Sequence, residues 1–246
     1  CFNWAMKKKE EGLIRHFGFS FHGTPELLDK ILSEHPEVEI VQIQMNYADW
    51  ESPLVQSGRL YEVLRKYNMP FLVMEPVKGG SLASASPEVE AEMKTIKPDA
   101  SVASWALRFA ASLPGVATVL SGMSNEEQMN DNLKTFTNFE PLSEEERKVI
   151  EKAQDELKKN PTVPCTSCRY CCDGCPQQIS IPDVFRALNT IRLYGEKDRA
   201  QSYYEKLTQT SGKAGDCIQC GQCESVCPQH LSIISLLEEA SEKLDK

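Results

Sequence analysis

Ten cysteines occur in this sequence of 246 residues, and eight of them form two runs with the same spacing. Each run reads C-x2-C-x2-C-x3-C and is followed directly by a proline. This spacing is typical of bacterial proteins whose cysteine thiolates ligate [4Fe–4S] clusters, so two runs predict two clusters. The first run is Cys165, Cys168, Cys171 and Cys175, and the second run is Cys217, Cys220, Cys223 and Cys227.

The two runs are expected to exchange their last cysteines. In two-cluster ferredoxins the fourth cysteine of each run ligates the cluster that the other run holds. One predicted cluster therefore takes Cys165, Cys168 and Cys171 together with Cys227. The other predicted cluster takes Cys217, Cys220 and Cys223 together with Cys175.

Two cysteines lie outside the runs, and zinc is a second metal that cysteine pairs can bind. A single C-x2-C pair would also suit zinc, so structural zinc is the alternative to iron. Cys172 is ambiguous by itself, because it forms a further C-x2-C pair with Cys175. The spacing of the second run selects Cys171 as the ligand, so we interpret Cys172 as a small residue packed near a cluster. Cys172 and Cys1, which lie outside the runs, make no disulfide framework.

Composition narrows the compartment and the partners. The formal net charge of −9 argues against nucleic acid and anionic membrane as partners. No apolar run reaches the roughly 20 residues of a transmembrane helix. Iron-ligating thiolates predict a reducing cytoplasm. The expected partners are a small-molecule substrate and a protein that exchanges electrons.

The pattern of apolar residues changes near residue 160. Before it, strands alternate with helices, which predicts an α/β domain with a parallel sheet over residues 1–160. No G-x-G-x-x-G follows a strand, and a complete (β/α)8 barrel needs about 250 residues. We therefore predict the C-terminal half of a (β/α)8 barrel, with strands over 14–20, 38–45, 71–74 and 116–120.

The second region, residues 161–246, has helical sequence around the two cysteine runs. Helices are predicted over 182–194 and 197–207, and Ser232 is expected to cap a final helix that ends near residue 244. The cysteine runs then lie at turns that join helices. This arrangement predicts an all-α, ferredoxin-like domain.

Polar side chains near the ends of the predicted strands indicate a ligand site in the first region. Barrel enzymes bind their ligands at the C-terminal ends of strands. Ordinary capping and loop hydrogen bonds are the alternative, and for Glu75 and Lys78 a surface ion pair. The residues at these ends are Ser20, His22, Gln42, Gln44, Asn46, Glu75, Lys78 and Ser121.

Three segments resemble motifs of the aldo-keto reductase family, in the family's order. Residues 12–20, in which Arg15 precedes a Gly-x-Ser strand end, are similar to the fifth-strand motif. Residues 70–76, with Gly79 and Gly80 following, are similar to the seventh strand and its glycine loop. Residues 121–128 resemble the eighth-strand loop. With the cysteine-rich tail, the chain resembles the iron–sulfur branch of this family, which carries a C-terminal dicluster ferredoxin-like domain.

The resemblance implies a (β/α)8 barrel of which this chain supplies strands five to eight, so the first half is expected to precede Cys1. It also implies residues that bind NAD(P)H: Ser20 and Gln42 on the nicotinamide amide, Asn132 on the adenine, and Ser121 in the eighth-strand loop. The tyrosine that stacks on nicotinamide in the family is Met74 here. The family's catalytic Asp, Tyr, Lys and His lie on earlier strands and match nothing in this sequence.

Two functions follow from these expectations. The first is an oxidoreductase in which two [4Fe–4S] clusters couple one-electron transfer to redox chemistry at the barrel. The second is a non-catalytic electron-transfer subunit, with the half barrel as a docking scaffold. The discriminating observation is whether a small molecule or only a protein partner exchanges electrons with the clusters.

Overall fold

The computed structural model describes residues 1–52, 55–137, 139–159, 162–194 and 197–245. The chain divides into two compact units, Cys1–Asp155 and Glu156–Lys246. Each unit has its own cluster of buried apolar side chains. Within the described residues, no helix combines the length and apolar character that are needed to cross a membrane.

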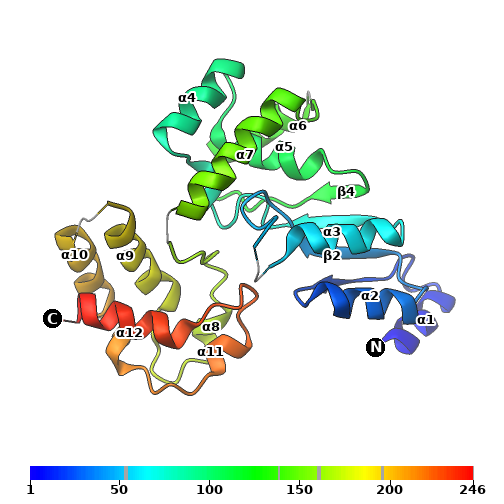
Figure 1. The fold of residues 1–246 in the computed structure, drawn as a ribbon. Coiled ribbons are helices and arrows are strands. Elements are labelled where there is room, and N and C mark those ends of the chain that lie inside the picture. The colour runs from blue at the N-terminus through cyan, green and yellow to red at the C-terminus, as the bar shows by residue number, and fades with distance from the viewer. Residues whose placement is uncertain (53–54, 138, 160–161, 195–196, 246) are drawn as a thin grey trace. The chain divides into compact units, whose positions relative to one another are not determined.

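The first unit is built on a four-stranded parallel sheet with the strand order β1-β2-β3-β4 (Figure 1). This arrangement confirms the predicted α/β class and parallel sheet. β1 begins four residues later than the sequence suggested, because only its last residues pair with β2. The strands are β1 Gly18–Phe21, β2 Ile40–Gln44, β3 Phe71–Met74 and β4 Val116–Val119.

Helices follow each strand of the first unit. Thr24 caps α2, where its hydroxyl accepts a hydrogen bond from the Leu27 N–H, and Pro25 occupies the first turn. The sequence analysis missed α4, although Ser86 and Pro87 provide the same cap-and-proline start. The helices are α1 Phe2–Glu10, α2 Pro25–Glu34, α3 Ser57–Lys66, α4 Pro87–Ile96, α5 Val102–Ala111, α6 Glu126–Thr137 and α7 Glu144–Lys159, with a 3-10 turn at Ser81–Ala83.

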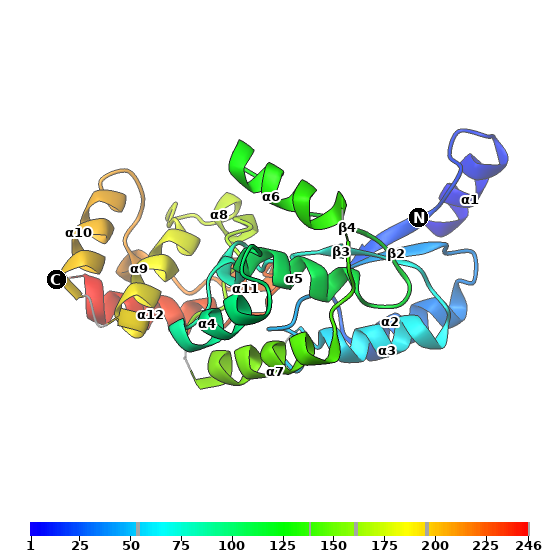
Figure 2. The same ribbon diagram turned by 90° about the horizontal axis from the view of Figure 1, so that it is seen from above.

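The core of the first unit lies between the sheet and its helices. Alternate residues of a strand point to opposite faces. In β2, Val41 and Ile43 are fully buried in this core, whereas Gln42 lies on the other face. Helices α2 and α3 lie side by side against the sheet (Figure 2). Trp105 and Phe109, four residues apart on α5, are core residues.

A buried ion pair ties α7 to α5. The guanidinium of Arg108 donates to both carboxylate oxygens of Glu146, at 2.5 and 2.9 Å, and to the carbonyl oxygen of Glu140 at 2.9 Å. Glu146 also closes a capping box with Ser143, the Ser-x-x-Glu pattern that marks a helix start in the sequence. Burial by itself would raise the pKa of Glu146, but the hydrogen bonds from Arg108 and from the Ser143 N–H outweigh it, and the pKa is lowered.

The second unit is helical, as predicted, and packs α9, α10 and α12 around a separate core. The short helices α8 and α11 lie against each other (Figure 1). Ser232 precedes α12, but its side chain makes no capping hydrogen bond. The elements are α8 Tyr170–Asp173, α9 Ile181–Tyr194, α10 Lys197–Leu207, a 3-10 turn Ala214–Asp216, α11 Gln222–Ser225 and α12 Ile233–Leu244.

Replacing Arg108 by methionine is expected to cost about 3–5 kcal/mol of stability, because it leaves the Glu146 carboxylate buried without its partner. Urea unfolding followed by tryptophan fluorescence measures this loss in the first unit, which holds all three tryptophans. The exposed pair Lys152–Glu92 provides the control. Lys152→Ala should change stability by less than about 1 kcal/mol. Equal effects of the two variants would contradict the assigned role of the buried pair.

The same ion pair should make stability depend on acid pH. The folded-state pKa of Glu146 is lowered, so the unfolded state binds the proton more tightly. The contribution is therefore fully present above the ordinary glutamate pKa and is lost as pH falls through the lowered value. The stability difference between the native protein and Glu146→Gln should narrow between pH 7 and pH 3, measured by the same unfolding. A difference that stays constant over this range would exclude the ion pair as its source.

Candidate functional site

Four cysteines line a small cavity that we call the Cys227 cavity. They are the first three cysteines of the first run and the last cysteine of the second run. Apolar side chains of Phe185, Leu231 and Ile233 complete its wall, and it contains about 310 Å³ of space outside the protein atoms, part of it open to solvent. The cysteines are Cys165, Cys168, Cys171 and Cys227.

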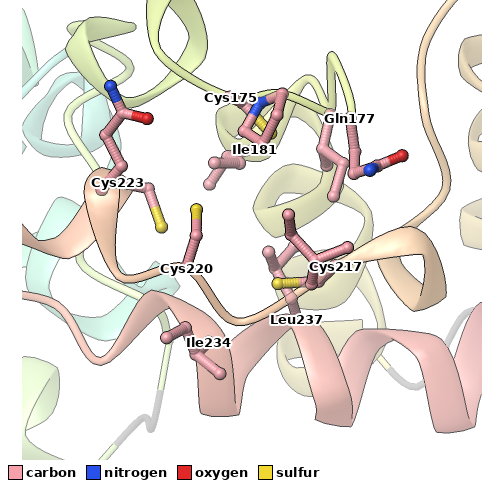
Figure 3. A pocket seen from close by; sticks show the side chains of 12 residues that line it. Cys175, Gln177, Ile181, Cys217, Cys220, Cys223, Ile234 and Leu237 are labelled. Atoms are coloured by element: carbon pink, nitrogen blue, oxygen red, sulfur yellow. The ribbon is translucent and has the colours of Figure 1, made fainter.

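The other four cysteines line a second cavity of similar size, about 330 Å³, which we call the Cys175 cavity. Figure 3 shows the sulfur atoms of Cys217, Cys220 and Cys223 around this cavity, with Cys175 approaching from a different segment. Ile181, Ile234 and Leu237 supply apolar walls. The structure thus groups the eight cysteines in the two sets that the spacing suggested, each with one cysteine from the other run.

An internal repeat underlies this grouping. Each cysteine of the second run lies 52 residues after its counterpart, and α11 follows α8 at the same offset. Backbone conformation repeats as well, since three pairs at this offset have positive φ. Left-handed residues turn the chain tightly, so cysteines three positions apart can converge on one cavity. The pairs are Ser167 and Gln219, Arg169 and Gly221, and Gln178 and His230.

Side-chain hydrogen bonds position the segments that lead into the runs. Asn189 of α9 accepts a hydrogen bond from the Val163 N–H at 2.7 Å and donates to its carbonyl oxygen at 2.9 Å. Before the second run, the Tyr204 hydroxyl accepts from the Ala214 N–H and donates to Asp245, both at 2.6 Å. These bonds hold each entry segment against the helices, so the helix packing determines where the first cysteines lie.

The donor chemistry of both cavities fits iron–sulfur clusters. Each cavity offers four thiols and apolar walls that limit water. Burial raises the pKa of the Cys165 and Cys223 thiols to about 11, so ligation requires that iron displace protons from them. Within the described residues, no three His, Cys, Asp or Glu side chains are placed to hold a single metal ion.

Cys172 lies outside both four-cysteine cavities. It is half-buried and lines a different, polar cavity with Arg169 and Asp183. The hydrogen bond from Cys171 is the main cause that lowers the pKa of Cys172 to about 7; burial opposes this shift and the positive charge of Arg169 adds to it. The position agrees with the interpretation of Cys172 as a packed residue that is not one of the eight predicted ligands of the two clusters.

In the first unit, two predicted nucleotide contacts lie in one row of the sheet. Ser20 of β1 pairs in register with Gln42 of β2, so both side chains lie on the face opposite the helices. Ser20 is exposed, and the Gln42 amide lies 3.7 Å from the Met74 sulfur. Gln42 therefore contacts Met74, whose side chain lines the next cavity.

The other two predicted contacts lie together in a cavity at the ends of β3 and β4. The Asn132 amide donates a hydrogen bond of 2.8 Å to the Ser121 hydroxyl. The cavity contains about 990 Å³ of space, part of it open to solvent, and Met74 lines it together with the loop at Gly79 and Gly80. The four predicted residues thus form two pairs, which Met74 connects.

The sequence analysis missed a buried polar network centred on Asp49. Asp49 is 2% exposed and accepts hydrogen bonds from Gln44 at 2.6 Å and Asn46 at 2.7 Å, and it pairs with Lys78. Lys78 is itself buried. The alternative prediction, in which Glu75 and Lys78 form a surface ion pair, is therefore wrong. An acidic residue just after a strand, followed by a lysine after the next strand, was the available signal. His22, by contrast, is exposed.

Two family models match the chain and divide it between them. The model of the aldo/keto reductase family matches residues 5–155, and the model of a 4Fe-4S dicluster domain matches residues 164–232. The first match covers more than half of the sequence. The chain belongs to the aldo/keto reductase family and carries a 4Fe-4S dicluster domain after its reductase domain.

Individual proteins resemble parts of the chain. The uncharacterized oxidoreductase YqkF of Bacillus subtilis is 26% identical over 162 residues, which are 58% of this chain and 51% of YqkF. Subunit alpha 1 of the acetyl-CoA decarbonylase/synthase complex of Methanosarcina mazei is 31% identical over 96 residues, 39% of this chain and 10% of the subunit. The chain thus spans about half of one relative and a tenth of the other.

Solved structures of aldo-keto reductases resemble part of the chain. The thermostable aldo-keto reductase Tm1743, in complex with the inhibitor epalrestat, has a TM-score of 0.50 at 22% identity. The likeness covers 62% of this chain and 53% of that protein. The holo form of aldo-keto reductase AKR11C1 from Bacillus halodurans is 24% identical, with a TM-score of 0.48, over 62% of this chain and 54% of that one.

Paired substitutions distinguish exchanged from unexchanged ligation. If Cys165 and Cys227 share a cluster, Cys165→Ala/Cys227→Ala damages one cluster and leaves the other with its native EPR spectrum. Cys165→Ala/Cys175→Ala should damage both. Iron analysis of anaerobically purified protein should give about four irons for the first variant and fewer for the second, because a [4Fe–4S] cluster needs four thiolates. The opposite result would assign each cluster to a single run.

Proposed function

We propose that this protein is an oxidoreductase that couples electron transfer through two [4Fe–4S] clusters to redox chemistry at the strand ends of its reductase domain. One observation carries the proposal: the eight cysteines form two four-thiol cavities, each of which combines three cysteines of one run with the last cysteine of the other. When bound, the clusters supply one-electron transfer. Because cluster-bound thiolates persist in reducing surroundings, we place the protein in the cytoplasm.

The chain's own residues contribute binding and shielding to this function. The apolar walls of each cavity limit the access of water to the thiolates, which helps to set the potential. Cys220 is exposed, whereas Cys171 and Cys223 are buried. We therefore infer that electrons enter or leave through the Cys175 cavity, at the side of Cys220.

For the first unit we propose a nicotinamide nucleotide as the ligand. Ser20 and Gln42 lie in one row of the sheet, and Ser121 and Asn132 share a hydrogen bond inside the adjoining cavity. Amide and hydroxyl groups at strand ends suit the amide and ribose groups of such a ligand. A hydride carries two electrons and a cluster accepts one, so two clusters match one nucleotide.

A second function is an electron-transfer subunit whose reductase domain docks a partner. Two observations favour it: the exposure of Cys220, and the likeness to a protein that is named as a subunit of a complex. In that case the clusters would exchange electrons with a protein partner, and the strand-end cavity would bind no redox nucleotide.

Metal analysis tests the cluster part of the proposal. Anaerobically purified protein should contain about eight irons and eight acid-labile sulfides per chain, the content of two [4Fe–4S] clusters. Stoichiometric zinc without sulfide would overturn this assignment in favour of structural metal sites.

Anaerobic titration of the oxidised protein with NADPH or NADH tests the nucleotide part. One of them should bleach the visible absorbance of the clusters. Asn132→Ala should raise the half-saturating concentration about tenfold, which corresponds to the loss of one or two hydrogen bonds. Asn130→Ala is the matched control, because Asn130 is exposed on the same helix and is absent from the cavity lining. Bleaching by dithionite but by neither nucleotide would favour the electron-transfer subunit.

A further inference from the structure

The two cavities are built by the same sequence repeat, so residues at equivalent positions of the two runs can be compared directly. The residue after the first cysteine of each run is Thr166 in the first run and Ile218 in the second, at the same offset of 52 residues. Both residues line the cavity of their own run's first three cysteines. The two cavities therefore have a hydroxyl at this position in one case and a hydrocarbon in the other.

Thr166 is in an unusual position for a polar residue. It is 6% exposed, and its hydroxyl oxygen is buried with no hydrogen-bond partner among the residues that the structure describes. A buried hydroxyl without a partner is costly, so such groups usually have a ligand or water that completes them. Here the cavity beside it is lined by four thiols, Cys165, Cys168, Cys171 and Cys227.

Ile218 differs from Thr166 in both chemistry and exposure. Its side chain offers no hydrogen-bond donor, and the residue is 58% exposed. At this position the Cys175 cavity therefore has no side chain that can donate a hydrogen bond, whereas the Thr166 hydroxyl can. The two halves of the repeat agree in cysteine spacing and in positive φ but differ at this side chain.

We propose that the Thr166 hydroxyl donates a hydrogen bond to a sulfur of the cluster in the Cys227 cavity and thereby raises the reduction potential of that cluster. Reduction adds one electron, and hence one negative charge, to a cluster. A hydrogen-bond donor stabilises the more negative state, and hydrogen bonds to the sulfurs are one of the factors that set cluster potentials. The hydroxyl keeps its proton throughout, so the step transfers one electron and no proton.

This inference rests on the proposed presence of two clusters and makes them unequal. The cluster in the Cys227 cavity has a side-chain hydrogen-bond donor, Thr166, after the first cysteine of the run. The cluster in the Cys175 cavity has no side-chain donor at the equivalent position, Ile218. A two-cluster protein with such a difference holds its electron preferentially on one side. The inference thus assigns a determinant of electron distribution to one side chain outside the ligand set.

Anaerobic redox titration of the cluster-loaded protein, followed by EPR and visible absorbance, tests the proposal. Thr166→Val keeps the shape and removes the hydroxyl. We expect about a tenfold fall in the reduced-to-oxidised ratio of one cluster at fixed potential, which is about 59 mV for a one-electron couple. The other cluster should be unaffected. Thr166→Ser should restore the native potential, because it retains the donor.

The repeat provides the matched control. Ile218→Val makes a comparable change at the equivalent position of the other cavity and should leave both potentials unchanged. Native potentials in a fully loaded Thr166→Val protein would overturn the proposal. An equal shift in Thr166→Ser would also overturn it, because packing of the methyl group would then be responsible.

Metal content separates failure of this inference from failure of the proposed function. Native protein without iron and sulfide would refute the clusters themselves, whereas loaded protein with unmoved potentials would refute only the role of Thr166. If Thr166→Val does not load, Thr166→Ala removes the hydroxyl without adding bulk, and the same titration decides the question.

Discussion

The convergence of four thiols on each cavity, one of them from a distant run, is the constraint on which the second unit depends. Cys227 must reach the first run and Cys175 must reach the second, although equivalent cysteines of the two runs lie 52 residues apart in the chain. Contacts between α8 and α11, and the packing of α12 against α9, bring the runs together. Asn189 and Tyr204 then hold the entry segments through paired hydrogen bonds. Clusters bound in these two cavities would therefore couple metal binding to folding of this unit, as in other small metal-binding domains.

The first unit depends on a different constraint, because polar groups must be held at the ends of a buried parallel sheet. Its sheet buries Val41, Ile43 and Phe71 under the helices. The polar residues after β2 and β3 satisfy one another around Asp49, because a buried charge needs both a partner and hydrogen bonds. This network holds the loop that starts at Glu75, and that loop lines the strand-end cavity.

The two units thus contribute complementary chemistry in one chain. The reductase domain offers a largely apolar cavity that also holds the polar side chains of Ser121, Gln128 and Asn132, and the dicluster domain offers thiols enclosed by apolar side chains. Nucleotide-type ligands need the first environment, and one-electron carriers need the second. The family assignment and the cysteine cavities together support an iron–sulfur oxidoreductase more directly than either does alone.

The sequence by itself determined the features that depend on the spacing of neighbouring residues. The repeated cysteine runs, the alternation of strands and helices, and the Ser143 capping box all depend on residues that are close in the chain, and the structure reproduces these elements. Helix α4 was missed although Ser86 and Pro87 provide a local start signal of the same kind. Only the tertiary structure decided that Lys78 is buried against Asp49, and that Thr166 has a buried, unpartnered hydroxyl while Ile218 is exposed. Burial depends on which segments pack together, and that information is not local to any stretch of sequence.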